Sequence, residues 1–306
     1  MKKLSIIGAG NVGSTTCQLI AYKNLADIIL LDRNAEKAKG IALDLMESSP
    51  LQGIEHNIIG TGNYADTKNS DLIIITAGSP RKEGQSREDL FGVNSAIIKE
   101  VIASAVKFSP NAVYIVITNP LDAMVFLAMK VGKIKKEKIV GMAGVLDSAR
   151  FAAFIAMELN ISPKTVSTLV LGSHGDLMVP IVSQTFVQGK PLNNVMKKEK
   201  IDELVKRTRN AGAEIISLMK TSSYYATGAS IALMAEAILL NKKTVLPCSA
   251  FVQGEFGVKD LFIGVPTKLG EKGIEKIIEI GLMQEEKNQL LQSAEAIKKI
   301  ISGIKT

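Results

Sequence analysis

The chain has 306 residues, of which 46% are hydrophobic and 22% charged, so it can bury a sizeable core and is not expected to be disordered. Its formal net charge is +7, but no basic tail and no basic patch interleaved with aromatic residues is present, which argues against nucleic-acid binding. The longest apolar tract, residues 112–129, is interrupted by Asn119, Pro120 and Asp122, so we expect no membrane span. The positive charge indicates lysine-rich solvated faces or, alternatively, a field that attracts small anions.

The first half of the chain alternates short apolar runs with helical patterns. The apolar runs are continuous rather than alternating, which is typical of parallel strands buried on both faces. We therefore predict a parallel sheet covered by helices on both sides. The expected strands are 4–7, 28–31, 72–76, 112–118 and 139–142, and the expected helices are 12–22, 35–47, 94–107 and 121–131.

The pattern changes near residues 142–145, where we place a domain boundary. No linker rich in proline or serine separates the two parts, so they are expected to pack closely. The second part mixes both kinds of element, with helices at 146–159, 201–220, 227–240 and 284–301 and strands at 165–171, 180–186 and 245–252. The predicted fold is α/β, with a Rossmann-type parallel sheet in residues 1–143 and an α+β catalytic domain in residues 144–306.

The two cysteines lie in predicted regular structure, Cys17 in a helix and Cys248 in a strand. Neither belongs to a CxxC pair or lies near a cluster of histidines, so we expect no metal site. Reduced thiols, and an N-terminal apolar run that ends at Gly8 without a cleavage site, favour a cytoplasmic protein.

A glycine-rich turn joins the first strand to the first helix and suggests a dinucleotide site. Such glycines permit a tight turn, let the backbone approach a pyrophosphate, and allow the helix and strand to pack closely. The second strand ends in Asp32, whose carboxylate suits the ribose hydroxyls of NAD and would repel the 2′-phosphate of NADP. Asp32 as a simple strand-end cap is the alternative, and Arg33 could soften the discrimination. The predicted contacts are Gly8, Ala9, Gly10, Asn11, Val12, Gly13 and Asp32.

Two arginines follow the buried strand that ends near Thr76. Arg81 and Arg87 lie on the expected loop 79–87, and each guanidinium can form a forked, charge-assisted contact with a carboxylate. The loop therefore favours a small substrate with two anionic groups, although a solvated loop is the simpler reading of Arg81.

A histidine and a nearby helix start supply the groups needed for acid–base chemistry. His174 follows an apolar run, whereas His56 lies in a polar stretch and is expected at the surface. Asp147 and Arg150 are three residues apart and project from one helix face. A carboxylate can orient an imidazole and an arginine can bind a carboxylate. A structural histidine and a helix-start ion pair remain alternatives.

Thr118, Asn119 and Pro120 follow a predicted parallel strand at its carboxyl end, where open α/β sheets bind ligands. A plain Asn-Pro turn is the alternative interpretation.

Together these segments resemble the lactate/malate dehydrogenase family, and most of all its lactate-dehydrogenase-like malate dehydrogenases. The resemblance spans nearly the whole chain. It is carried by GAGNVG, the arginine loop, TNP, LDSARF, GSHGD and SSYYA, at residues 8–13, 79–87, 118–120, 146–151, 172–176 and 222–226.

The resemblance implies a role for each site residue. His174 would accept a proton, Asp147 would orient it, and Arg150 would bind the C1 carboxylate. Arg87 would polarise the reacting carbonyl, and Asn119 would bind the substrate oxygen. The residues implied near the cofactor NAD are Asn94, Ile117, Thr118 and Asn119.

Arg81 decides the expected substrate. The family position that it matches faces the C3 substituent, and malate dehydrogenases carry arginine there, whereas lactate dehydrogenases usually carry glutamine. An unpaired guanidinium beside pyruvate in a closed site would cost several kcal/mol, so (S)-malate and oxaloacetate are favoured. L-lactate dehydrogenase and a non-catalytic NAD-binding protein are the alternatives.

The chain departs from the family pattern at several positions, and one of them bears on regulation. Ala152 stands where some relatives carry an arginine that binds a sugar bisphosphate, which argues against such regulation. Glu83 and Gln85 replace the more usual proline and methionine.

The expected helix 35–47 places Ala38, Ile41, Ala42 and Leu45 on one side. This face is expected to pack within the chain, and by resemblance it would also join subunits in a homodimer or homotetramer. The family also implies a role in the tricarboxylic acid cycle, with a small dicarboxylate as the partner.

Overall fold

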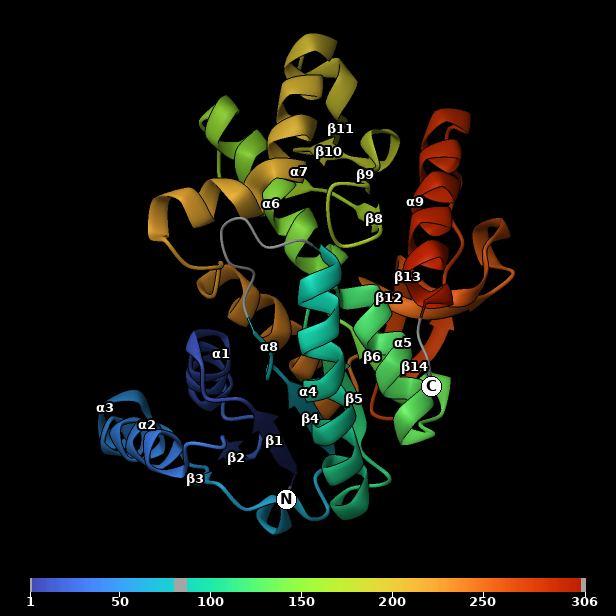
Figure 1. Ribbon diagram of the computed structural model, residues 1–306. Coiled ribbons are helices and arrows are strands. Elements are labelled where there is room, and N and C mark those ends of the chain that lie inside the picture. Colours follow the sequence, from blue (N-terminus) through green and yellow to red (C-terminus); the bar gives the residue numbers. More distant parts are fainter. Residues whose placement is uncertain (1, 80–86, 304–306) are drawn as a thin grey trace.

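The first half of the chain forms the alternating strands and helices that its apolar pattern predicts (Figure 1). The computed structural model describes residues 2–79 and 87–303, with the backbone alone at 87–89. In this half the elements are β1 (Lys3–Ile7), α1 (Asn11–Tyr22), β2 (Asp27–Leu31), α2 (Ala35–Glu47), α3 (Ser49–Gln52), β3 (Ile58–Thr61), β4 (Leu72–Ile75), α4 (Arg87–Phe108), β5 (Val113–Val116), α5 (Leu121–Gly132) and β6 (Ile139–Gly141).

The second half mixes shorter strands with long helices. Its elements are α6 (Gly144–Leu159), β7 (Val166–Ser167), β8 (Val170–Gly172), β9 (Met178–Pro180), β10 (Phe186–Val187), β11 (Lys190–Pro191), α7 (Lys198–Met219), α8 (Tyr225–Leu239), β12 (Thr244–Gln253), β13 (Lys259–Gly270), β14 (Gly273–Ile277) and α9 (Gln284–Ser302). None of the described helices is long and apolar enough to cross a bilayer.

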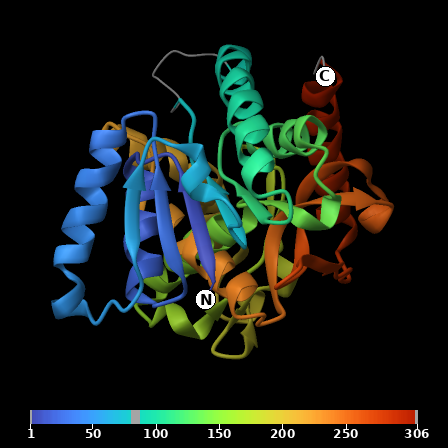
Figure 2. The same cartoon turned by 90° about the horizontal axis from the view of Figure 1, so that it is seen from below.

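One sheet runs through both halves of the molecule. Among the described residues its strand order is β3-β2-β1-β4-β5-β6-β12-β13-β8-β9, with β14 paired to β13. The first six strands are parallel, in the order of a dinucleotide-binding fold, which confirms the predicted fold class. Seen from below, α2 flanks the β3 edge, and α9 lies at the opposite end of the molecule (Figure 2).

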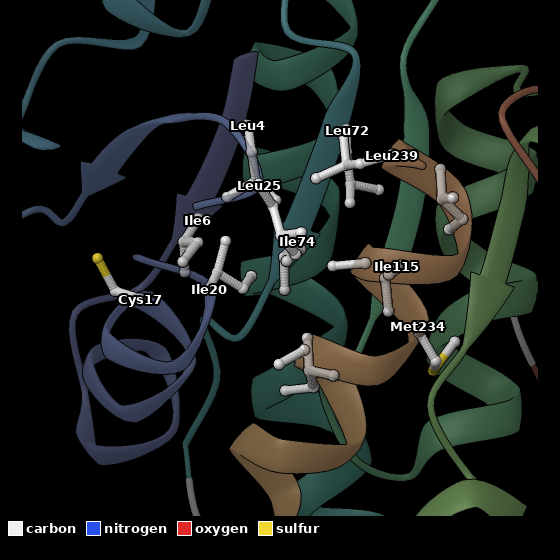
Figure 3. Packing of buried hydrophobic residues seen from close by; sticks show 14 of the residues in the cluster. Leu4, Ile6, Cys17, Ile20, Leu25, Leu72, Ile74, Ile115, Met234 and Leu239 are labelled. Carbon is white, nitrogen blue, oxygen red and sulfur yellow. The ribbon is translucent and has the colours of Figure 1, made fainter. Parts of the chain in front are cut away.

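Side chains of the central strands alternate between two apolar layers, as the period of a strand requires. On one face Leu4, Ile6, Leu72, Ile74 and Ile115 meet helices α1 and α8 (Figure 3). The opposite face packs against α4 and α5. Helix α8 comes from the second half of the chain, yet it packs into the core of the first half.

Several predicted elements were wrong. The expected strand 180–186 is interrupted by a 3₁₀ helix, Val182–Gln184, in which Ser183 binds the carboxylate of Glu286 through both its N–H and its hydroxyl. The expected strand 165–171 divides into β7 and β8, and strands β3, β11, β13 and β14 were not predicted.

Candidate active site

The turn between β1 and α1 is shaped by two glycines that have no room for a side chain. Gly8 has a φ of +113°, and a Cβ there would lie 2.7 Å from the Thr76 hydroxyl oxygen. A Cβ on Gly13 would lie 1.8 Å from the Gly8 carbonyl oxygen. Gly10 differs, since a Cβ there would meet no atom within 4 Å. Open space therefore faces the turn at Gly10.

The start of helix α1 offers its amide groups to that space. Gly10 is the N-cap residue, no side chain caps the helix, and the first turn, which contains Asn11 and Val12, carries no acidic residue. The free N–H groups and the positive end of the helix dipole suit a phosphate. The residues present therefore fit the pyrophosphate of a dinucleotide.

Asp32 follows β2 and lies beside this turn. Its carboxylate accepts hydrogen bonds from the Ala9 N–H at 2.7 Å and from the Asn34 N–H at 2.9 Å. Asp32 thus acts as a strand-end cap, the alternative weighed from the sequence. A carboxylate has about four acceptor positions, so two such bonds leave capacity for ribose hydroxyls.

Asn94 joins the segments that follow β4 and β5. The Asn94 side chain is buried; its Oδ1 accepts the Ser79 N–H at 2.7 Å and its Nδ2 donates to the Asn119 carbonyl at 2.7 Å. The Thr118 hydroxyl donates to the Ala77 carbonyl at 2.7 Å. Asn94 and Thr118 therefore hold together the carboxyl ends of two neighbouring strands, where the buried Ile117 and the exposed Asn119 also lie.

His174, Asp147 and Arg150 come together as the sequence predicts. Asp147 is almost completely buried in the first turn of α6. Its Oδ2 lies 2.7 Å from Nδ1 of His174, and its Oδ1 lies 3.2 Å from Nη1 of Arg150. The carboxylate thus fixes the imidazole and the guanidinium side by side, and Nδ1 of the imidazole faces the carboxylate.

Charges around the imidazole control its protonation. Burial of His174 disfavours the imidazolium, but the charge and hydrogen bond of Asp147, with a smaller contribution from Asp122, outweigh it and raise the pKa. Arg150 acts in the opposite direction. A histidine with a raised pKa beside an arginine can exchange a proton with a substrate that carries a carboxylate.

Asp122 is a buried carboxylate that the sequence interpretation did not assign to the site. It lies in the first turn of α5, where its Oδ2 accepts the backbone N–H of His174 at 3.1 Å and its Oδ1 accepts the Ser249 hydroxyl at 2.6 Å. An acidic residue in a first helical turn is ordinary, so the sequence gives no signal for these contacts.

Of the two arginines of the expected loop, the structure describes only the backbone of Arg87. Arg81 lies outside the described residues. Arg87 was expected on a loop but is the first residue of α4, a helix that begins seven residues before the predicted start at Asn94. His56 is half-buried rather than on the surface, with its Nδ1 3.5 Å from an Asp27 oxygen.

The chain matches known proteins along nearly its full length. Residues 2–141 match the NAD binding domain of lactate/malate dehydrogenase, and residues 144–306 match the α/β C-terminal domain of the same family. A malate dehydrogenase of Bacillus cytotoxicus is 49% identical over 303 residues, covering 98% of this chain and 97% of the relative.

Solved structures from one organism resemble this chain almost equally. A malate dehydrogenase of Cryptosporidium parvum is 40% identical with a TM-score of 0.96, covering 98% of each chain. The lactate dehydrogenase of the same organism, complexed with lactic acid and NAD, is also 40% identical, with a TM-score of 0.95 and 99% coverage of each chain. With both family domains matched along nearly its full length, the chain belongs to the lactate/malate dehydrogenase family.

Proposed function

We propose that the protein is an NAD-dependent malate dehydrogenase that interconverts (S)-malate and oxaloacetate. The observation that carries this proposal is the contact of Asp147 with both His174 and Arg150, which places an acid–base group beside a carboxylate-binding group. The malate dehydrogenases among the relatives support the choice of substrate class.

In the proposed reaction His174 moves the proton. Asp147 accepts a hydrogen bond from the Nδ1–H group of His174, which leaves Nε2 to take the proton of the malate hydroxyl during oxidation and return it during reduction. The buried carboxylate stabilises the imidazolium that forms. When bound, NAD supplies the acceptor for the hydride that leaves C2.

Arginines hold the substrate in this proposal. Arg150 binds the C1 carboxylate through a forked contact, and Asp147 restrains its guanidinium from one side. Arg87 polarises the carbonyl, and Asn119 donates a hydrogen bond to the same oxygen. Arg81 pairs with the second carboxylate, which a lactate or pyruvate molecule lacks.

The cofactor lies across the carboxyl ends of the parallel strands in this proposal. Its pyrophosphate faces Gly10 and the first turn of α1, with the Gly8–Gly13 turn as its cradle. Asp32 receives the adenosine ribose and favours NAD over NADP. The segments around Asn94 and Asn119, with Ile117 and Thr118, contact the nicotinamide end.

L-lactate dehydrogenase remains the second candidate, because one lactate dehydrogenase matches the backbone nearly as well as the malate enzyme of the same organism. Backbone similarity therefore does not distinguish the two substrates, and the choice depends on Arg81. A non-catalytic NAD-binding protein would have no use for the paired contacts of Asp147.

We also propose a cytoplasmic homodimer or homotetramer that acts in the tricarboxylic acid cycle. The family resemblance supports these assignments. The face of α2 that carries Ala38, Ile41, Ala42 and Leu45 packs within the chain, whereas Leu43 of the same helix is exposed. Residues 1–143 would bind the cofactor and residues 144–306 would supply most of the catalytic groups, a division supported by the two matched family regions.

Steady-state NADH oxidation with oxaloacetate and with pyruvate tests this proposal, and NADPH in place of NADH tests the cofactor. We expect kcat/KM for oxaloacetate to exceed that for pyruvate by about a hundredfold or more, because an unpaired Arg81 penalises pyruvate. A preference for pyruvate would identify a lactate dehydrogenase, and NADH binding without turnover of either acid would identify a non-catalytic protein.

A further inference from the structure

The backbone of the loop that carries His174 is anchored by two side chains from other parts of the fold. This loop joins β8 to β9. The Ser173 N–H donates to the hydroxyl oxygen of Ser293 on α9 at 2.8 Å, and the His174 N–H donates to Asp122 on α5 at 3.1 Å. Both acceptor residues are buried, so neither bond competes with bulk water.

Asp122 connects more than the His174 loop. Its second oxygen accepts the hydroxyl of Ser249, a completely buried residue of β12, at 2.6 Å. Asp122 also follows Pro120 by two residues, and Pro120 follows Asn119. One carboxylate therefore links the segment of the proposed substrate amide to the loop of the proposed proton acceptor.

The charge of Asp122 acts on the imidazole in the same direction as that of Asp147. Both carboxylates raise the pKa of His174, whereas burial and Arg150 lower it. Burial raises the pKa of Asp122 itself to about 6, although the hydrogen bonds of Ser249 and His174 oppose this shift. The side chains that β12 and α9 supply in the contacts described are uncharged: the Ser249 hydroxyl binds Asp122, and the Ser293 hydroxyl binds the Ser173 N–H. Asp176 is the other charged residue of the loop.

We propose that Asp122 is a positioning residue for His174. Its carboxylate holds the backbone of the histidine in place relative to Asn119, and it supplies a second negative charge that favours the protonated imidazole. Asp147 fixes the side chain of His174 through the ring nitrogen, and Asp122 fixes its main chain through the backbone N–H.

The proposal can be tested in the free protein without any turnover. The chain has two histidines, so the NMR titration of ring protons gives two curves, and His56→Gln identifies the one that belongs to His174. Asp122→Asn keeps the size of the side chain and an oxygen that can accept the His174 N–H, but removes the charge. We expect the His174 pKa to fall by about half a unit or more.

Two further variants complete the titration. Ser249→Ala leaves the carboxylate but removes a hydrogen bond that favours its charged form, so we expect a smaller fall in the His174 pKa; it also serves if Asp122→Asn does not fold. Asp27→Asn removes a carboxylate beside the other histidine and should leave the His174 curve unchanged. An unchanged His174 pKa in both Asp122→Asn and Ser249→Ala would overturn the electrostatic role.

The kinetic part of the test rests on the proposed function. Asp122→Ala should lower kcat for oxaloacetate reduction by about tenfold to a hundredfold, with little change in KM for NADH, because a displaced proton donor weakens the chemical step. Asp122→Asn should restore most of kcat at low pH, and its basic limb should move to lower pH. Wild-type kcat in Asp122→Ala would overturn the positioning role.

If the wild-type protein does not reduce oxaloacetate, the proposed function fails, and the NMR titration still decides the role of Asp122.

Discussion

The histidine of the site couples proton binding to the stability of the fold. Because His174 has a raised pKa in the folded chain, its ion pair with Asp147 stabilises the protein fully below the pKa of an unfolded histidine, about 6.5. This contribution is lost as the pH rises through the higher folded pKa.

We therefore predict that the stability lost in His174→Gln depends on pH. The difference in unfolding free energy between the wild type and His174→Gln should be largest near about pH 6 and should shrink toward about pH 9. Urea unfolding at several pH values measures it, with His56→Gln as the control for loss of any histidine. A difference that stays constant with pH would contradict the ion pair.

The second residue-scale prediction concerns Arg81, which lies outside the described residues. Arg81→Gln removes the proposed partner of the second carboxylate, so kcat/KM for oxaloacetate should fall by roughly two to three orders of magnitude while that for pyruvate rises. Lys82→Gln removes the same charge from the adjacent position and should change either value little. Equal effects of the two substitutions would mean that loop charge, rather than a specific contact, selects the acid.

At the scale of elements, two glycines of the β1–α1 turn have different roles, because Gly13 is needed for packing and Gly10 is proposed to make room for the cofactor. Gly13→Ala forces a Cβ against the Gly8 carbonyl and should destabilise the fold by several kcal/mol, whereas Gly10→Ala meets no protein atom. Gly10→Ala should therefore keep the wild-type melting temperature but weaken NADH binding by about tenfold or more, because its methyl group occupies the approach of the pyrophosphate. Thermal unfolding and NADH titration distinguish the two variants. If Gly10→Ala binds NADH normally, the pyrophosphate does not lie there.

The sequence predicted five of the six parallel strands, all but β3, because these five are continuous apolar runs between clear helical patterns. It failed for β13, which contains Gly264 and Pro266, residues that locally favour a loop. Gly264 is required there because a Cβ would lie 2.6 Å from the Gly172 carbonyl of β8, a contact that only the folded chain reveals. Long-range pairing thus overrode local preference.

In the candidate site too, local contacts could be predicted from the sequence and long-range contacts could not. Asp147 and Arg150 could be paired from their spacing, and His174 from the strand before it. The role of Asp122 could not be predicted, because Ser249 and His174 lie 127 and 52 residues away in the sequence. Contacts of this separation depend on how the second half of the chain packs against the first.

At the scale of the whole molecule, the two halves share a core and should unfold together. Met234 on α8 is completely buried among residues of the first half (Figure 3). Met234→Ala should cost about 2 to 5 kcal/mol and should accelerate amide hydrogen exchange in both β1 and β13. Leu240→Ala, at a half-exposed position just after the same helix, should change exchange little. Faster exchange confined to the second half would show that the halves open separately.

The position of α8 also has a consequence for biosynthesis. While the chain emerges from the ribosome, the six parallel strands are complete by Gly141, but α8, which together with α1 covers one of their faces, begins only at Tyr225. A nascent chain of intermediate length therefore exposes apolar side chains on that face of the sheet before α8 has been translated. Chaperones that recognise such surfaces have their longest opportunity during this interval, and synthesis of residues 225–239 should end it.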